Sequence, residues 1–357
     1  TTAIGEKQLQ SLLDDSTLRN SKGDFPYTQQ LFFDPVLSNP FPSSRTVIYD
    51  KSTNNDNRND VGDFFYINEN NQIARYQLEF RPYAAESDVT DSQGTLATGE
   101  SDGYYLWDFQ GKTINMLGKE YSIVRATVST QEVYEGVKLT LLSGAVQDVL
   151  DEGETKTYIA NSKEYDVTMD FVGDTTARFI VNGEQTDSLQ VGDTFRLADR
   201  SYIGVRSINY DGFQGGVRAA EFYLSASKVV LQDANVGDDK SSHSLQFNSE
   251  IIDDTQVIIQ GDINGIDGKI SRIQLDIGAD ADIFLGEGDR LSKQLDEPGA
   301  LLGSWDIQYG GLNPEPSEQI VLTAAGTDQY ILRFQNGDGD RAKLPIAMID
   351  DNNNLRF

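Results

Sequence analysis

Residues 138–142 read Lys-Leu-Thr-Leu-Leu, residues 165–171 read Tyr-Asp-Val-Thr-Met-Asp-Phe, and residues 179–183 read Phe-Ile-Val-Asn-Gly. In these runs apolar side chains alternate with polar ones, and Gly, Asn or Asp residues close each run. Alternation of period two is typical of strands with one buried face, and the closing residues are those of tight turns. All three runs lie between Gly111 and Asp233, a stretch with almost no helical pattern. We therefore predict a β-sandwich there.

The same pattern continues on both sides of this stretch, at residues 73–80, 256–260, 270–277, 319–322 and 329–334. We expect an all-β protein of two or three β-sandwich domains of the Ig-like kind, since 357 residues exceed one ordinary core. A polar run from Asp233 to Ser244 is interpreted as a linker. The expected divisions are a helix and extended segment at 1–45, a first β-domain at 46–110 that C-terminal strands could complete, a central β-domain at 111–233, and a C-terminal β-domain at 245–357.

The N-terminal region has a different pattern. Leucines at near-helical spacing predict a short helix within residues 6–20, which Gly23 and Pro26 would end. The aromatic, proline-containing stretch that follows, residues 25–42, is interpreted as an extended, irregular segment. Its aromatic side chains are candidates for contacts between copies of the chain, with packing on the chain's own first domain as the alternative. These candidates are Phe25, Tyr27, Phe32, Phe33 and Phe41. Trp107 and Trp305 lie in apolar runs and are predicted to be core residues.

The charge excludes several classes of partner. The chain has 57 acidic and 29 basic residues, a formal net charge of −28. Such a surface repels nucleic acid and anionic lipid, so neither is an expected partner. Cations or a basic protein are the natural counter-charges, although a generic acidic, soluble surface would look the same.

The sequence has no Cys, which excludes disulfides and thiolate chemistry, and no apolar run long enough to span a membrane. It starts Thr1-Thr2-Ala3-Ile4, without Met or a signal-peptide pattern. We expect a processed, extracellular chain, although a truncated form would look the same.

Catalytic motifs are missing. The single histidine, His243, lies in the polar run, and there is no nucleophile elbow, zinc-type His pair or phosphate-binding loop. Paired carboxylates could serve a glycosidase, but among 57 acids no pair stands out. We therefore predict that the chain is not an enzyme.

Cation binding, with Ca²⁺ as the expected ion, is the chemistry that the acidic turns favour. Three loops carry oxygen ligands near glycine or asparagine, as Ca²⁺ sites do. The alternative is that Asn-Gly and Asp-Gly are simply favoured hairpin turns. The candidate ligands are Asp262, Asn264 and Asp267, then Asn336, Asp338 and Asp340, and finally Asp50, Asp56 and Asp60.

Several ordered segments resemble the S-layer protein family of archaea, particularly of the small-genome lineages. They include residues 72–80 (QIARYQLEF), 116–124 (MLGKEYSIV), 139–144 (LTLLSG), 152–158, 179–184, 221–224, 305–309 and 328–334. The matches spread over residues 47–340. The resemblance implies a secreted, self-assembling surface protein of β-domains, often with bound cations and glycans, and without catalytic residues.

One feature departs from that family. No Asn is followed two positions later by Ser or Thr, so N-glycosylation is not expected. We expect a structural protein that assembles with copies of itself at the cell surface, as an S-layer, filament or sheath. A carbohydrate-binding or adhesion β-module is the alternative, and a secreted glycosidase comes third.

Overall fold

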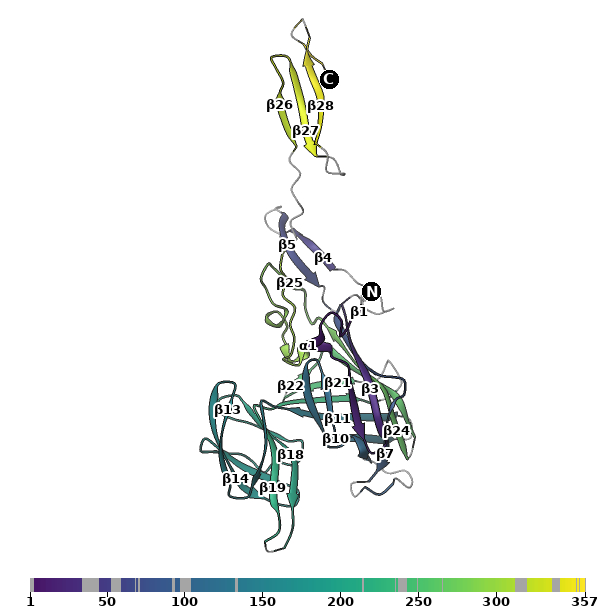
Figure 1. The fold of residues 1–357 in the computed structure, drawn as a ribbon, viewed down its shortest axis with the longest axis vertical. Helices are drawn as coiled ribbons and strands as arrows, with labels where there is room; N and C mark the ends of the chain where they lie inside the picture. The colour runs from purple at the N-terminus through teal and green to yellow at the C-terminus, as the bar shows by residue number, and fades with distance from the viewer. Residues whose placement is uncertain are drawn as a thin grey trace. The chain divides into compact units, whose positions relative to one another are not determined.

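The chain forms two separate units, residues 1–310 and 311–357. The computed structural model describes residues 3–33, 45–52, 59–67, 69, 71–91, 94–96, 104–131, 134–213, 215–234, 236, 243–248, 250–264, 266–311, 320–335, 341–350, 352 and 354–356. Strands make up nearly all of the regular structure (Figure 1), which confirms the predicted all-β class. The Ig-like topology stays a prediction.

Most strands of the first unit belong to one continuous sheet, the main body. Its order is β1, β3, β6, β24, β7, β8, β10, β11, β20, β21, β22, with β2 beside β3, β23 beside β24 and β9 beside β10. The bounds are β1 Ala3–Ile4, β2 Ser16–Asn20, β3 Gly23–Phe32, β6 Gln72–Phe80, β7 Ala85–Thr90, β8 Tyr104–Leu106, β9 Thr113–Met116, β10 Lys119–Gln131, β11 Tyr134–Ser143, β20 Ser227–Asp233, β21 His243–Phe247, β22 Glu250–Ile252, β23 Thr255–Asn264 and β24 Asp267–Gly278.

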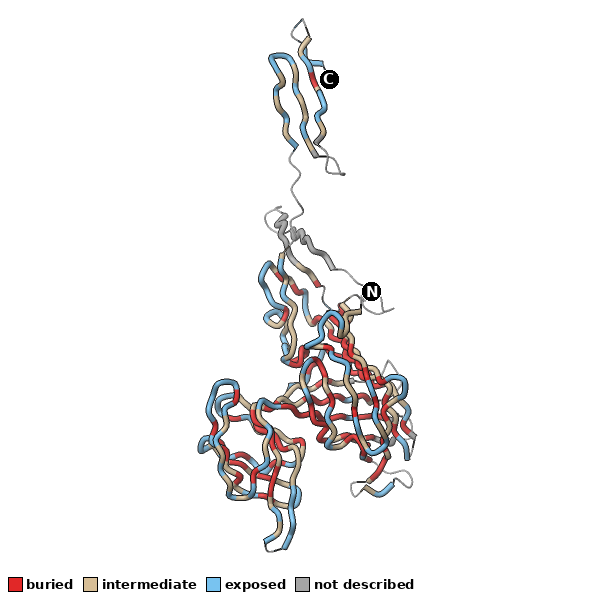
Figure 2. Tube along the Cα trace, in the orientation of Figure 1, coloured by how far each residue is buried: buried red, intermediate tan, exposed pale blue. Residues whose placement is uncertain are grey.

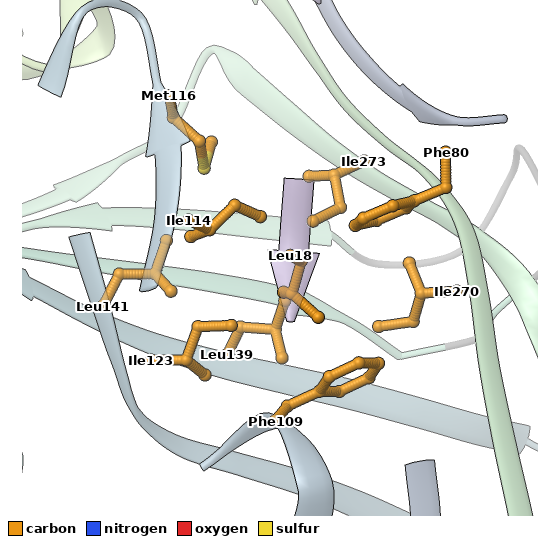
Figure 3. Close-up of a pocket in the computed structure, with 10 residues that line it drawn as sticks. All are labelled: Leu18, Phe80, Phe109, Ile114, Met116, Ile123, Leu139, Leu141, Ile270 and Ile273. Atoms are coloured by element: carbon orange, nitrogen blue, oxygen red, sulfur yellow. The ribbon is translucent and has the colours of Figure 1, made fainter. Parts of the chain in front are cut away.

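The two halves of this sheet face each other across an apolar core. In Figure 3, Leu18 of β2, Phe80 of β6 and Ile270 of β24 point toward Ile123 of β10 and Leu139 of β11. The void between them is only about 10 Å³ and its lining is apolar. Between these residues the interior is therefore the filled core of a sandwich-like body, with no room for a ligand at this point.

Strand β3 replaces the irregular segment predicted from residue 25 onward. Phe25, Tyr27, Gln29 and Leu31 are all buried at alternate positions. The pattern is hidden in the sequence because Pro26 and a glutamine interrupt it. Gln29 tolerates burial because its amide group donates to the Asp14 carbonyl at 2.6 Å and its Oε1 accepts from Tyr76 Oη at 2.7 Å.

The predicted N-terminal helix is present for one turn only, α1 Gln10–Leu13. At Asp14 the backbone becomes extended (ψ 129°), and Ser16–Asn20 then pair with β3 as strand β2. Leu18 enters the core from this strand, so its burial outweighs the local helical spacing of the leucines.

A second β-sandwich, the inserted sandwich, lies between β11 and β20. It has two sheets, ordered β12-β19-β18-β17 and β13-β14-β15-β16. The bounds are β12 Val146–Asp151, β13 Thr155–Ala160, β14 Lys163–Val172, β15 Ala177–Val181, β16 Glu184–Gln185, β17 Thr194–Arg196, β18 Tyr202–Tyr210 and β19 Arg218–Leu224. Its own core includes Phe179 and Phe222, whose ring centroids are 5.3 Å apart.

The insertion leaves and re-enters the main body at neighbouring points, because Ser143 pairs with Ser227 across β11 and β20. A small buried cluster that includes Val124 and Tyr223 joins the two bodies. Arg206 of the inserted sandwich donates to Ser122 Oγ of the main body at 2.6 Å. The two bodies are thus held together by both apolar and polar contacts.

The domain divisions differ from those predicted. β9 to β11 and β20 belong to the main body, so the prediction 111–233 joins strands of two bodies. The predicted linker from Asp233 to Ser244 connects two paired strands, β20 and β21, and Asp233 is buried, accepting from the Ile259 N–H at 2.7 Å. Within the predicted segment 1–45, strands β1, β2 and β3 belong to the main body, and the predicted domain 245–357 is divided between the two units.

A small sheet and short 3₁₀ turns complete the first unit. The sheet has the order β25-β5-β4, with β4 Arg45–Ser52, β5 Asn59–Ile67 and β25 Ile283–Leu285. The turns are η1 Trp107–Phe109, η2 Leu291–Lys293 and η3 Pro298–Leu301. Strand β5 pairs with β4 and β25, whereas β6, the next strand along the chain, pairs with β3 and β24.

The second unit, here called the C-terminal sheet, is a single sheet ordered β26-β27-β28-β29. Its bounds are β26 Val321–Ala324, β27 Gln329–Gln335, β28 Arg341–Ile349 and β29 Leu355–Arg356.

Candidate functional site: the C-terminal sheet

The register of the C-terminal sheet sorts its side chains onto two unlike faces. Leu322 pairs with Leu332, and Leu332 pairs with Leu344, so these three leucines share one face. Alternation along each strand then extends that face. This apolar face comprises Leu322, Ala324, Tyr330, Leu332, Phe334, Ala342, Leu344, Ala347, Ile349 and Leu355.

No second layer covers the apolar face within the described part of residues 311–357. Leu322 is 57% exposed, Leu344 is 49% exposed and Leu355 is 50% exposed. Among the described residues of this unit only Ala347 is buried, whereas both bodies of the first unit have extensive buried cores (Figure 2). A sheet usually needs a packed apolar face for stability, and no described residue of this unit supplies a second layer for that face.

Charge is confined to the opposite face and to the turns. Arg333 pairs with Lys343, and Arg356 pairs with Met348, which places these three basic residues on the other face. The four strands contain no acidic residue. Residues 311–357 hold four of the 29 basic and seven of the 57 acidic residues, so the first unit has a net charge of −25.

The sequence predicts strands in this sheet but does not reveal its uncovered apolar face. Residues 329–334 were expected as a strand and lie in β27, and the predicted strand 319–322 overlaps β26. The signal for an open face was the set of apolar positions that the register aligns, but the register is set by strand pairing and is not visible in one sequence.

The predicted cation loops have different outcomes. Asn264 pairs with Asp267 at the end of the β23–β24 hairpin, and Asp262 lies opposite Lys269 in that ladder. Asp262 and Asp267 are exposed. The hairpin alternative describes this backbone, and a cation there stays a prediction.

In the small sheet Asp50 lies opposite Val61 and Asp60 lies opposite Lys51, so these two acids are not cross-strand partners. The remaining candidates, Asp56, Asn336, Asp338 and Asp340, lie outside the described residues. Across the described ranges, no three acidic or histidine side chains converge in a way that could hold a metal ion.

A cavity of about 90 Å³ is lined by five acidic residues that the sequence analysis did not single out: Asp253, Asp254, Asp280, Asp296 and Glu297. Burial, together with the charges of Asp280 and Asp253, raises the pKa of Asp254 above its ordinary value. Burial, together with the charges of Asp253 and Glu250, likewise raises the pKa of Glu297, against a hydrogen bond from the Asp253 N–H at 2.8 Å. Like charges therefore repel one another around this cavity.

Two of the aromatic candidates for contacts between copies, Phe25 and Tyr27, belong to the chain's own core, and a role of the others between copies stays a prediction. Phe25 and Tyr27 are buried, and Tyr27 packs edge-to-face on Phe80 at 5.4 Å. Phe33 packs against Trp305, with 6.0 Å between the two ring centroids. Phe32 is half-buried in β3, and Phe41 lies outside the described residues. A contact between copies needs exposed side chains. Phe25 and Tyr27 are not exposed, because the alternation of side chains along β3 points both of them into the chain's own core.

Comparisons with known proteins identify no relative of this chain. A comparison with protein-family models, one with curated proteins and one with solved structures each find no match. Within the described residues, no helix reaches the length and apolar character that crossing a membrane requires.

Proposed function

We propose that the chain is a structural, non-catalytic protein of the cell exterior, which assembles with copies of itself into a surface layer or filament. The observation that supports this proposal is the open apolar face of the C-terminal sheet. A layer of β-sheet with an uncovered apolar face gains free energy when a second sheet packs on it at about 10 Å.

The occupant that we propose for this face is the same face of a second copy. Each chain carries a net charge of −28, so any contact that brought acidic surfaces together would be opposed. The apolar face contains no charged residue, and it can therefore meet its own copy without burying like charges. Such a contact is self-complementary about a two-fold axis.

A two-fold contact alone closes into a dimer, so a layer or filament needs a second contact. The basic face of the C-terminal sheet, with Arg333, Lys343 and Arg356, suits the first unit of a neighbouring copy, whose net charge is −25. Growth beyond the dimer would then weaken with added salt, while the apolar contact would persist.

The test is sedimentation velocity of the full chain over a wide concentration range, comparing two matched double variants. Leu322→Gln with Leu344→Gln changes the apolar face, and Thr323→Gln with Met348→Gln changes the opposite face of the same two strands. Burying the exposed half of each leucine is worth about 1 kcal/mol, or about 4 kcal/mol over two copies. The first variant should therefore weaken the dimer roughly a thousandfold.

The control variant should dimerise as the unmodified chain does. A chain that stays monomeric at every concentration, or a dimer that survives the apolar-face variant unchanged, would refute the proposed contact. In the first case the apolar face has another occupant, such as the chain's own first unit.

A further inference from the structure

A cleft with a volume of about 470 Å³ lies between the main body and the inserted sandwich. It is within the range of about 300–1,000 Å³ that small-molecule sites occupy. One wall comes from the main body and includes Tyr105, Trp107 and Arg125. The other wall comes from the inserted sandwich and includes Asp174 and Gln190.

Trp107 is the notable side chain of this cleft. The sequence predicts a core residue, but the structure ends strand β8 at Leu106 and turns Trp107 outward on η1, with 43% of the residue exposed. A Cβ added at Gly94 would lie 2.9 Å from Trp107 Cζ2, so the indole packs directly on the backbone of Gly94. The ring is thus supported on one side and open on another.

The walls of the cleft are held in place before any ligand arrives. Arg125 donates to the Val191 carbonyl at 3.0 Å, across the junction of the two bodies. An added Cβ at Gly192 would lie 3.2 Å from Val124 Cγ2, so the Gly192 backbone of the inserted sandwich lies directly against a main-body side chain. The Gln190–Asp193 turn is fixed by the bond from the Gln190 N–H to Asp193 Oδ2 at 3.0 Å. A preformed cleft loses little entropy on binding.

The charges of the cleft define the class of ligand. In a chain of net charge −28, the described lining has one carboxylate, Asp174, and one guanidinium, Arg125. The other polar groups are neutral amides and hydroxyls, Gln110, Gln190, Thr175 and Tyr105, which together offer both donors and acceptors. This lining gives no net attraction to an anion or a cation. It suits a neutral ligand with many hydroxyl groups and one apolar face.

The geometry points to a saccharide site, in which a neutral sugar ring lays its C–H face on the open side of Trp107. Its hydroxyls would bond with Gln110 on one wall and with Asp174 and Gln190 on the other. This inference does not depend on assembly through the C-terminal sheet.

The experiment titrates the full chain with maltotriose, cellotriose and tri-N-acetylchitotriose, following tryptophan fluorescence and binding heat. At least one trisaccharide should bind and change the fluorescence. Trp107→Ala should weaken that binding at least tenfold, whereas Trp107→Phe should retain most of it. Tyr83→Ala, which removes an aromatic residue that is 75% exposed elsewhere in the main body, should have no effect.

A second variant tests the opposite wall. Gln190→Ala changes an exposed residue, so folding should be kept, and binding should weaken severalfold. Failure of all three sugars to bind, or binding that Trp107→Ala and Gln190→Ala leave unchanged, would overturn the inference. Equally tight binding of trigalacturonate would overturn the neutral class. The Leu322→Gln, Leu344→Gln variant should bind sugar normally, and Trp107→Ala should sediment normally, so the two proposals fail independently.

Discussion

Leu18→Ala tests whether the N-terminal region belongs to the chain's own core. Leu18 is 1% exposed and points into the centre of the main body between Phe109, Ile123 and Ile270 (Figure 3). The surrounding void is only about 10 Å³, so the neighbours already touch and cannot close fully around the space that three lost carbon atoms leave. Deleting a buried leucine side chain costs about 2–5 kcal/mol, and we expect about 3 kcal/mol here.

The assay is urea unfolding followed by tryptophan fluorescence. Both tryptophans, Trp107 and Trp305, lie outside the inserted sandwich, so the signal reports on the main body. Leu18→Ala should lower the urea midpoint without changing the slope. Leu9→Ala is the control, because Leu9 is 40% exposed on the same N-terminal segment, and its cost should stay below about 1 kcal/mol. Equal effects of the two substitutions would show that residues 16–20 do not fill this core.

Two pH-dependent predictions of opposite sign follow from the acidic groups. In the inserted sandwich burial would raise the pKa of Asp199, but hydrogen bonds from Lys163, Ser201 and Tyr165 outweigh it and lower that pKa below its ordinary value. The stabilisation is therefore present above pH ~4 and is lost as pH falls further, so Asp199→Asn should cost about 1 kcal/mol in thermal unfolding at neutral pH and nothing in strong acid; an equal cost at both would contradict this. In the acidic cavity the pKa of Asp254 is raised, so its contribution is present at acid pH and is lost as pH rises through the folded pKa. Asp254→Asn should raise the melting temperature at neutral pH but not near pH ~4, and Asp187→Asn, at an exposed position of the inserted sandwich, should leave both melting temperatures unchanged; a lower melting temperature for Asp254→Asn at neutral pH would refute the repulsion.

Alternation in the sequence predicts the fold class well, because period-two burial is a local property. It fails where a polar residue occupies a buried position, as Gln29 does in β3. The hydrogen-bond partners that make this burial possible, Asp14 and Tyr76, lie far from Gln29 in the sequence. It also fails at the domain level. The strands on either side of Ser143 look alike, although one belongs to the main body and the next to the inserted sandwich.

The candidate sites were harder to predict than the strands. The Asp262–Asp267 stretch has both the ligands of a cation loop and the residues of a hairpin, and local sequence does not separate them. Leu322, Leu332 and Leu344 become one surface only through strand register, and Trp107 becomes exposed only because β8 ends one residue before it. Both features depend on contacts between segments distant in sequence.

The pairing of Ser143 with Ser227 has a consequence for how this architecture can vary. Because the two residues are cross-strand neighbours, β11 and β20 could be joined by a short turn, and the main body would keep every strand and its register. The inserted sandwich is therefore an insertion between two paired strands of the main body. Unrelated domains whose ends lie close together could be grafted at the same position, so the surface presented to the surroundings could diversify without redesign of the framework that carries it.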